Sequence, residues 1–190
     1  MPARRINLDG KVYCRRAVND KATPTADSGL HIRQATAADR PGLIELVNSA
    51  YAIETFLQGT RTDEARLSAM MEKGTILVAE NAATKASSSP PLACVYFEVR
   101  GASGYLGQLA VDPAHQGTGL ARVLVLAAED RLRAAGCQAV EIVVLSMRPE
   151  LLPIYRRFGY VETGIEEEFR PTRALAPGVQ VHGIKMSKQL

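Results

Sequence analysis

Cysteine is scarce in this chain of 190 residues, since Cys14, Cys94 and Cys137 are the only three and lie far apart. No two of them form a C-x-x-C pair, and the three histidines are also scattered, so the spacings of a zinc site are missing. Cysteines of this kind are typical of reduced, mostly buried thiols in an intracellular protein. We therefore expect no metal.

Long apolar runs are missing as well. No stretch approaches the roughly 18 consecutive apolar residues that a membrane span needs. The first residues, MPARRINLDGKVYCRRAV, lack the apolar core of a secretory signal, and Asp9 together with the absence of serine argues against a mitochondrial one. The sequence therefore predicts a cytoplasmic protein with no membrane partner.

Charge of one sign is not in large excess, because 23 Lys and Arg stand against 20 Asp and Glu. Residues 1–29 hold six basic and three acidic residues, which equals the net charge of +3 of the whole chain. A nearly neutral remainder argues against a nucleic-acid surface, which normally shows as a basic face. Binding of nucleic acid through residues 1–29 alone is a weaker alternative, and it predicts a steep dependence on salt.

The chain divides into an arm and one domain. Residues 1–29 show no sustained hydrophobic period and end in the polar stretch NDKATPTADSG, so we interpret them as a basic arm. From residue 30 to 190 the periods predict the order β-α-α-β-β-β-α-β-α-β-β, which is an α+β fold with a layered sheet. The hydrophobic fraction of the whole chain, 46%, is ordinary for a globular protein.

Local signals fix several elements of this order. Thr36 and Asp39 form a capping-box-like T-x-x-D before a helical pattern. The short turn GASG predicts an antiparallel hairpin between the strands LACVYFEVR and YLGQLAV. The nearly continuous apolar run AVEIVVL predicts a central strand buried on both faces.

The segment HQGTGLARVL, residues 115–124, places two glycines directly before a strong helical pattern. A helix start leaves about four backbone N–H groups unpaired and carries roughly half a positive charge, so a glycine-rich start favours a bound phosphate or pyrophosphate. A P-loop is excluded because the segment has no lysine, and the dinucleotide fingerprint fails because Arg122 stands where it needs glycine.

Coenzyme A is the remaining ligand class, and a family resemblance supports it. LAVDPAHQGTGLARVLV resembles motif A of the GNAT superfamily of acyl-CoA N-acyltransferases, [QR]-x-x-G-x-[GA], with Gln116, Gly119 and Ala121 at the three specified positions. Downstream, LLPIYRRFGYVETG resembles motif B, Y-x-[KR]-x-G-[FY], which begins at Tyr155. The resemblance covers about residues 30–190. It implies a mixed, centrally splayed β-sheet flanked by helices.

The resemblance also implies an acetyl-CoA-dependent N-acetyltransferase that acts on a primary amine of a small molecule or a protein, as a monomer or homodimer. Tyr155 matches the family's proton donor to the coenzyme sulfur, and a phenol of pKa ~10 suits a thiol leaving group. Main-chain groups at the end of YLGQLAV hold the pantetheine arm, and one amide there stabilises the oxyanion. The expected coenzyme contacts are Leu109, Ala110, Val111, Gln116, Gly117, Thr118, Gly119, Leu120, Ala121 and Arg122.

The general base and the acceptor site are less defined. Alternation along the strand puts Tyr105 on the same face as Leu109 and Val111, where some relatives carry a catalytic carboxylate. Glu98, Glu54 and a water chain are alternative bases, although solvated carboxylates are the ordinary interpretation of both residues. The family usually contacts its acceptor through the loop at residues 52–61. The predicted acceptor residues are Glu54, Phe56, Gln58 and Tyr105.

One position departs from the family pattern. Many relatives place Asn seven residues before the motif B tyrosine, and this chain has Arg148 there. A salt bridge and a ligand contact both remain open for that side chain. The departure and the missing strand carboxylate keep a second function in view, a non-catalytic acyl-CoA-binding sensor or scaffold, since a fold does not imply an activity.

Overall fold

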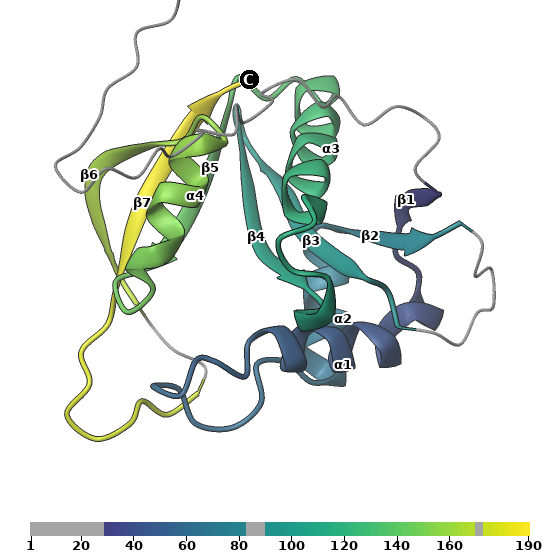
Figure 1. The fold of residues 1–190 in the computed structure, drawn as a ribbon. Helices are drawn as coiled ribbons and strands as arrows, with labels where there is room; N and C mark the ends of the chain where they lie inside the picture. The colour runs from purple at the N-terminus through teal and green to yellow at the C-terminus, as the bar shows by residue number, and fades with distance from the viewer. Residues whose placement is uncertain (1–28, 83–89, 170–172) are drawn as a thin grey trace, which may run out of the picture.

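The computed structural model describes residues 29–82, 90–169 and 173–190 (Figure 1). Apart from Gly29, the predicted arm lies outside them, and so does Cys14. The order of helices and strands is as predicted, which confirms the α+β class. The elements are β1 (Leu30–Gln34), α1 (Arg40–Ala50), α2 (Glu64–Lys73), β2 (Thr75–Asn81), β3 (Ala93–Arg100), β4 (Ser103–Val111), α3 (Leu120–Ala134), β5 (Ala139–Leu145), α4 (Leu152–Arg157), β6 (Val161–Glu168) and β7 (His182–Gln189).

A seven-stranded sheet in the order β1-β2-β3-β4-β5-β7-β6 forms the middle layer. Neighbouring strands are antiparallel except β4 and β5, which are parallel, so the expected β3–β4 hairpin is confirmed. Helices α3 and α4 pack on one face in a cluster with Leu77, Val95 and Ile142. Helices α1 and α2 pack on the other face with Val78 and Tyr96. Helices thus cover both faces of the sheet (Figure 1), each over an apolar cluster.

Strands β4 and β5 separate along their length. They pair from Ser103 with Ala139 to Tyr105 with Glu141, and the carboxyl-terminal parts of the two strands then spread apart (Figure 1). The splayed sheet that the family resemblance implied is therefore present. Because the carboxyl ends of parallel strands lie at one edge, the opening faces the turns that follow β4 and β5.

Gln108 interrupts strand β4. Its φ is 44°, and the β3–β4 register shifts from Cys94 opposite Ala110 to Tyr96 opposite Gly107, which leaves one extra residue in β4. Side chains therefore change faces at this bulge. Tyr105 packs with the α1 side, whereas Leu109 packs with the α3 side. The predicted placement of Tyr105, Leu109 and Val111 on one face is wrong, because simple alternation does not allow for the extra residue.

Strand β5 is buried on one face rather than on both. Val140, Ile142 and Val144 are fully buried with α3, while the alternate residues are only partly buried. Val143 and Leu145 on that second face border the opening between β4 and β5. The apolar cluster that α1 and α2 form on the other side of the sheet includes no residue of β5, so the prediction of burial on both faces is corrected.

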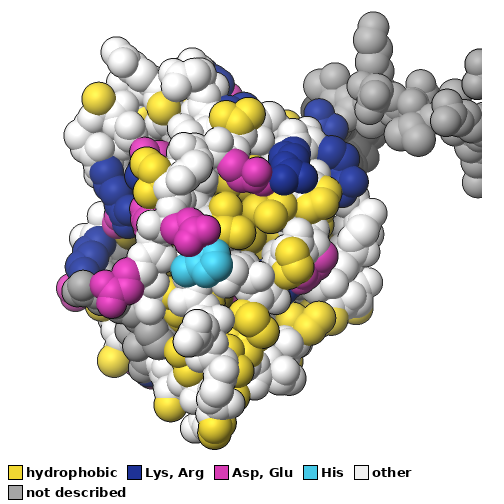
Figure 2. All heavy atoms as spheres, turned by 90° about the vertical axis from the view of Figure 1, so that its left-hand side faces the viewer, with side chains coloured by type: hydrophobic (Ala, Val, Ile, Leu, Met, Phe, Trp, Pro, Cys, Tyr) yellow, Lys and Arg dark blue, Asp and Glu magenta, His cyan; other side chains and the backbone are white. Residues whose placement is uncertain are grey.

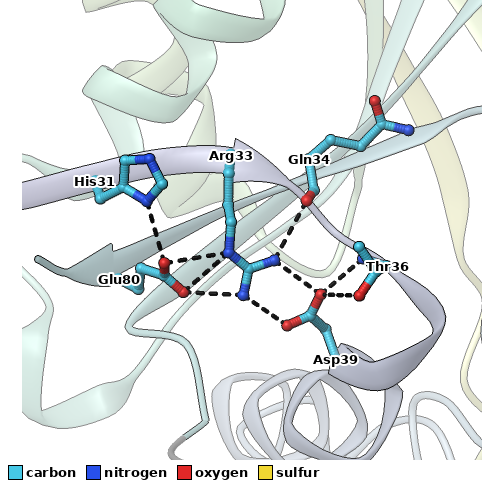
Figure 3. Close-up of polar contacts among 6 residues, drawn as sticks. All are labelled: His31, Arg33, Gln34, Thr36, Asp39 and Glu80. Atoms are coloured by element: carbon cyan, nitrogen blue, oxygen red, sulfur yellow. Dashed lines mark hydrogen bonds and ion pairs between the residues drawn. The ribbon is translucent and has the colours of Figure 1, made fainter. Parts of the chain in front are cut away.

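An ion-pair network anchors the first strand to the first helix (Figure 3). The Arg33 guanidinium donates to Asp39 at 2.7 Å and 2.8 Å and to Glu80 of the neighbouring strand at 2.9 Å. The Asp39 carboxylate also accepts from the backbone N–H of Thr36 at 2.7 Å, as the T-x-x-D pattern predicts. Hydrogen bonds from Arg33 lower the pKa of Asp39 to about 2. The network fixes the entry of the chain into α1.

Strand β6 lies at the edge of the sheet and is exposed along most of its length. Val161 is 65% and Ile165 is 53% exposed. The view onto this side shows hydrophobic side chains among charged ones (Figure 2). Among the described residues, no helix combines the length and the apolar character that crossing a membrane requires.

Candidate active site

The predicted coenzyme loop forms a tight, exposed turn between β4 and α3. A short 3₁₀ turn at Pro113–His115 precedes it, and Thr118 closes it by donating its hydroxyl to the His115 carbonyl at 2.6 Å. Gly117 and Gly119 have φ of 78° and 91°, which L side chains rarely adopt, and a Cβ on either would meet no protein atom within 4 Å. The turn therefore leaves its backbone open to a ligand.

The first backbone amides of α3 border this turn. The Val123 N–H donates to the Gly119 carbonyl at 3.1 Å, which is the start of the helical ladder. The amides of residues 120–122 precede that ladder, so by helix geometry they have no acceptor within the helix. Together with the positive end of the helix dipole, they suit the two charges of a pyrophosphate.

A pocket of about 80 Å³ lies where β4 and β5 separate. Residues of both strands, of the loop after α1 and of the segment leading into α4 line it. Its polar lining comes from Tyr51, Glu54, Arg61, Tyr105, Gln108, Arg148 and Tyr155. The pocket connects the two faces of the sheet, because Tyr155 packs with the α3 cluster and Tyr51 and Tyr105 pack with the α1 cluster.

Tyr155 reaches this pocket from α4. Its ring makes edge contacts with Phe158 at 6.1 Å and Tyr160 at 5.8 Å between centroids, which fixes the ring. Burial raises the pKa of Tyr155 above its ordinary value of 10, and the nearby Tyr51 and Tyr105 raise it further, while Arg148 acts in the opposite direction. The phenol therefore stays protonated at neutral pH and is available as a proton donor.

Two more tyrosines complete the pocket wall. Tyr51 donates its hydroxyl to the Leu109 carbonyl at 3.1 Å, so it contacts the end of β4 that was expected to hold the coenzyme arm. Burial raises the pKa of Tyr51 to about 12. Tyr105 lies beneath the Arg100 guanidinium, 3.9 Å from its ring centroid. Both phenols are neutral near pH 7, so neither supplies an anionic base there.

Glu54 is a buried carboxylate, which corrects the expectation that it is solvated. Its side chain is 3% exposed, and three guanidiniums approach it. Arg61 and Arg148 donate to it at 3.4 Å each, and Arg173 donates at 3.2 Å. For Arg148, the salt bridge is therefore present. The Arg148 side chain also lines the pocket, so it can contact a ligand there as well.

The structure separates the other predicted acceptor residues. Glu54 and Tyr105 line the pocket with Tyr155, whereas Phe56 is buried and does not line it, and Gln58 is exposed. The backbone of this loop pairs with the segment near the C-terminus, since the Gln58 N–H donates to the Ala174 carbonyl at 2.9 Å. That pairing ties the loop at residues 52–61 to the segment that precedes β7.

Other candidates lie elsewhere. Glu98 accepts hydrogen bonds from Tyr96 and Arg100 and does not border the pocket. Arg122 is exposed on the first turn of α3, close to the glycine turn. Sequence reasoning missed Tyr51, Arg61 and Arg173. Tyr51 belongs to the helical pattern of apolar residues that follows Thr36, so a sequence signal for it was present. No sequence signal connects Arg173 with Glu54, which lies 119 positions earlier.

The described part of the chain contains no group of three or more His, Cys, Asp or Glu side chains that could hold a metal ion. Cys94 and Cys137 are free and buried, and burial raises the pKa of Cys94 to about 12. The polar side chains at the pocket are phenols, guanidiniums, one carboxylate and the amide of Gln108. They can donate protons, bind anions and orient a ligand.

Comparison with known proteins agrees with this geometry. The family model described as an acetyltransferase (GNAT) domain matches residues 45–175. A probable glucosamine 6-phosphate N-acetyltransferase 2 of Oryza sativa subsp. japonica is 32% identical over 107 residues, which are 54% of this chain and 63% of that protein. The chain thus aligns with less than two thirds of that relative.

Solved structures show the same fold. The ribosomal-protein-S18-alanine N-acetyltransferase from Escherichia coli superposes with a TM-score of 0.62 at 20% identity, over 84% of this chain and 93% of that one. A putative acetyltransferase from Salmonella typhimurium, solved with acetyl-CoA, gives 0.64 at 21% identity over 85% and 94%. With the family model matching more than half of its length, the chain belongs to the GNAT acetyltransferase family.

Proposed function

We propose that this chain is an N-acetyltransferase that moves an acetyl group from acetyl-CoA directly to a primary amine. The observation that carries the proposal is the position of Tyr155, a partly buried phenol in the pocket where β4 and β5 separate. Membership of the GNAT family and the open glycine turn before α3 support it. The relative from Oryza sativa supports an amine acceptor, by its name.

Different residues of the chain bind the coenzyme and carry out the transfer. The amides of residues 116–122 bind the pyrophosphate, and the main chain at Leu109, Ala110 and Val111 holds the pantetheine arm beside the pocket. The amine nitrogen attacks the thioester carbonyl, and a main-chain amide of β4 stabilises the oxyanion. As the C–S bond breaks, Tyr155 donates its proton to the thiolate, and the proton that the new amide nitrogen releases returns the Tyr155 phenolate to its neutral form.

The amine must lose a proton before it attacks. Glu98 lies outside the pocket, and both oxygens of Glu54 accept from guanidiniums. We therefore assign this proton to water in the pocket instead of to either carboxylate. Tyr51, Tyr105 and Gln108 line the pocket with groups that can order such water.

Mass spectrometry of a panel of amines tests the proposal. The purified full chain is incubated with acetyl-CoA and with amino sugars, glucosamine 6-phosphate among them, polyamines, amino acids and peptides with free amino termini. Acetylation of at least one acceptor, with release of one coenzyme thiol per acetyl group, is the expected result. Tight binding of acetyl-CoA without any acetylated product would favour the alternative, a non-catalytic acyl-CoA-binding module.

A further inference from the structure

Positive charge exceeds negative charge at one end of the pocket. Three guanidiniums, of Arg61, Arg148 and Arg173, approach the single carboxylate of Glu54. Glu150 also accepts a hydrogen bond from Arg148, but its side chain is 56% exposed and faces solvent. One guanidinium would suffice to neutralise Glu54. The cluster therefore carries uncompensated positive charge next to the reaction site.

The excess positive charge affects Arg173, the most buried arginine of the cluster. The pKa of Arg173 is lowered, first by burial and then by the positive charge of Arg61. Its side chain is 7% exposed, and it also donates to the Gly59 carbonyl at 3.2 Å. Placing like charges in a partly buried region costs free energy unless an anion joins them. The cluster holds two carboxylates, Glu54 and the exposed Glu150, for its three guanidiniums, so a further anion would relieve this cost.

Two of the three arginines point to the pocket. Arg61 lies over the Tyr51 ring at 4.5 Å, and this stacking together with Glu54 fixes its orientation. Arg148 is 16% exposed, and like Arg61 it lines the pocket that contains Tyr155. A guanidinium offers a planar set of N–H donors that matches a phosphate or a carboxylate. Glu54 uses only part of the set on Arg61, and Glu54 and Glu150 together use only part of the set on Arg148.

We propose that Arg61 and Arg148 bind an anionic group of the acceptor, with Glu54 and Arg173 fixing both side chains. The acceptor is then a small primary amine that carries a phosphate or a carboxylate. This inference rests on the proposed function and narrows its substrate class. Arg148 is a substrate-binding residue in it, which accounts for arginine at the position where many relatives have asparagine.

Binding of inorganic phosphate tests the subsite without catalysis. The full chain is saturated with coenzyme A, so that the glycine turn is occupied, and phosphate is titrated at constant ionic strength with ³¹P line broadening as the readout. Arg61→Gln and Arg148→Gln are each expected to weaken phosphate binding about tenfold or more. Arg148→Lys keeps the charge but not the planar set of donors, so its affinity for phosphate should lie between those of the parent protein and Arg148→Gln. The control Arg133→Gln, an exposed residue of α3 paired with Asp130, should match the parent protein.

Matched acceptors extend the test to turnover and distinguish the anionic groups. Amino sugars with and without a phosphate, and amino acids with a free or an amidated carboxylate, are compared. For at least one pair, kcat/KM is expected to be about tenfold or more higher for the anionic acceptor. Arg61→Gln should lose this preference, because the KM for the anionic acceptor rises. Equal use of both members, or phosphate binding unchanged in folded arginine variants, would overturn the subsite but leave acetyl transfer intact. Failure to bind acetyl-CoA would instead contradict the proposed function.

Discussion

Replacing Glu129 by alanine probes the buried polar cluster that joins α3 to the last strands. Glu129 is 1% exposed and accepts from the Tyr160 hydroxyl at 2.9 Å and from the Lys188 ammonium at 2.6 Å. Truncation leaves a buried hydroxyl and a partly buried ammonium without their shared acceptor. Each loss is of the order of 1–3 kcal/mol, so together they should lower the free energy of unfolding by about 3 kcal/mol. That loss is a large part of the free energy of unfolding of an ordinary domain, which is ~5–15 kcal/mol.

Urea denaturation followed by circular dichroism measures this loss. Asp130→Ala is the matched control, because Asp130 is the next residue of the same helix but is 75% exposed. Its effect should stay within about 0.5 kcal/mol. The double variant Glu129→Ala with Lys188→Met should recover part of the stability, since it removes the unpaired ammonium. Equal unfolding free energies for Glu129→Ala and Asp130→Ala would refute the reasoning.

Two further predictions concern the glycine turn and the Arg33 network. Gly119→Ala should raise the dissociation constant of acetyl-CoA about tenfold in calorimetry, because alanine disfavours the φ of 91°. The control Gly136→Ala, with a φ of 88° at the other end of α3, should lower the stability by a similar amount without changing the affinity for acetyl-CoA. Equal affinities of the parent protein and Gly119→Ala for acetyl-CoA would exclude the turn as the coenzyme site. The depressed pKa of Asp39 means that its contribution to stability is present above the unfolded pKa of ~3.9 and is lost as pH falls toward about 2. The difference in melting temperature between the parent and Asp39→Asn should therefore be constant above pH ~5 and shrink between pH 4 and 2, and a constant difference at all pH values would contradict this.

Local patterns were enough to predict most of the fold. The T-x-x-D signal marked the turn at Thr36 before α1, and the GASG turn marked the hairpin of β3 and β4. The long apolar face predicted α3, and Leu124, Ala128 and Leu132 are fully buried on it. These elements depend on hydrogen bonds and packing between residues close in sequence, so a short window contains the whole signal.

Features that depend on distant contacts were not predictable. The bulge at Gln108 reverses the faces of β4, yet nothing in YLGQLAV distinguishes a bulged strand from a regular one. Glu54 is typical of a solvated residue by its type, and only the approach of Arg148 and Arg173 from later elements explains its burial. Tyr155 was identifiable because its motif is local, whereas the arginine cluster is assembled by the tertiary fold.

The rate of acetyl transfer by Tyr155→Phe tests the central claim most directly. Phenylalanine keeps the ring contacts with Phe158 and Tyr160 and removes only the hydroxyl. With an acceptor identified from the amine panel, the account predicts that kcat falls about a hundredfold or more while the dissociation constant of acetyl-CoA stays within about twofold. An unchanged kcat in the folded variant would contradict the assignment of Tyr155 as the proton donor.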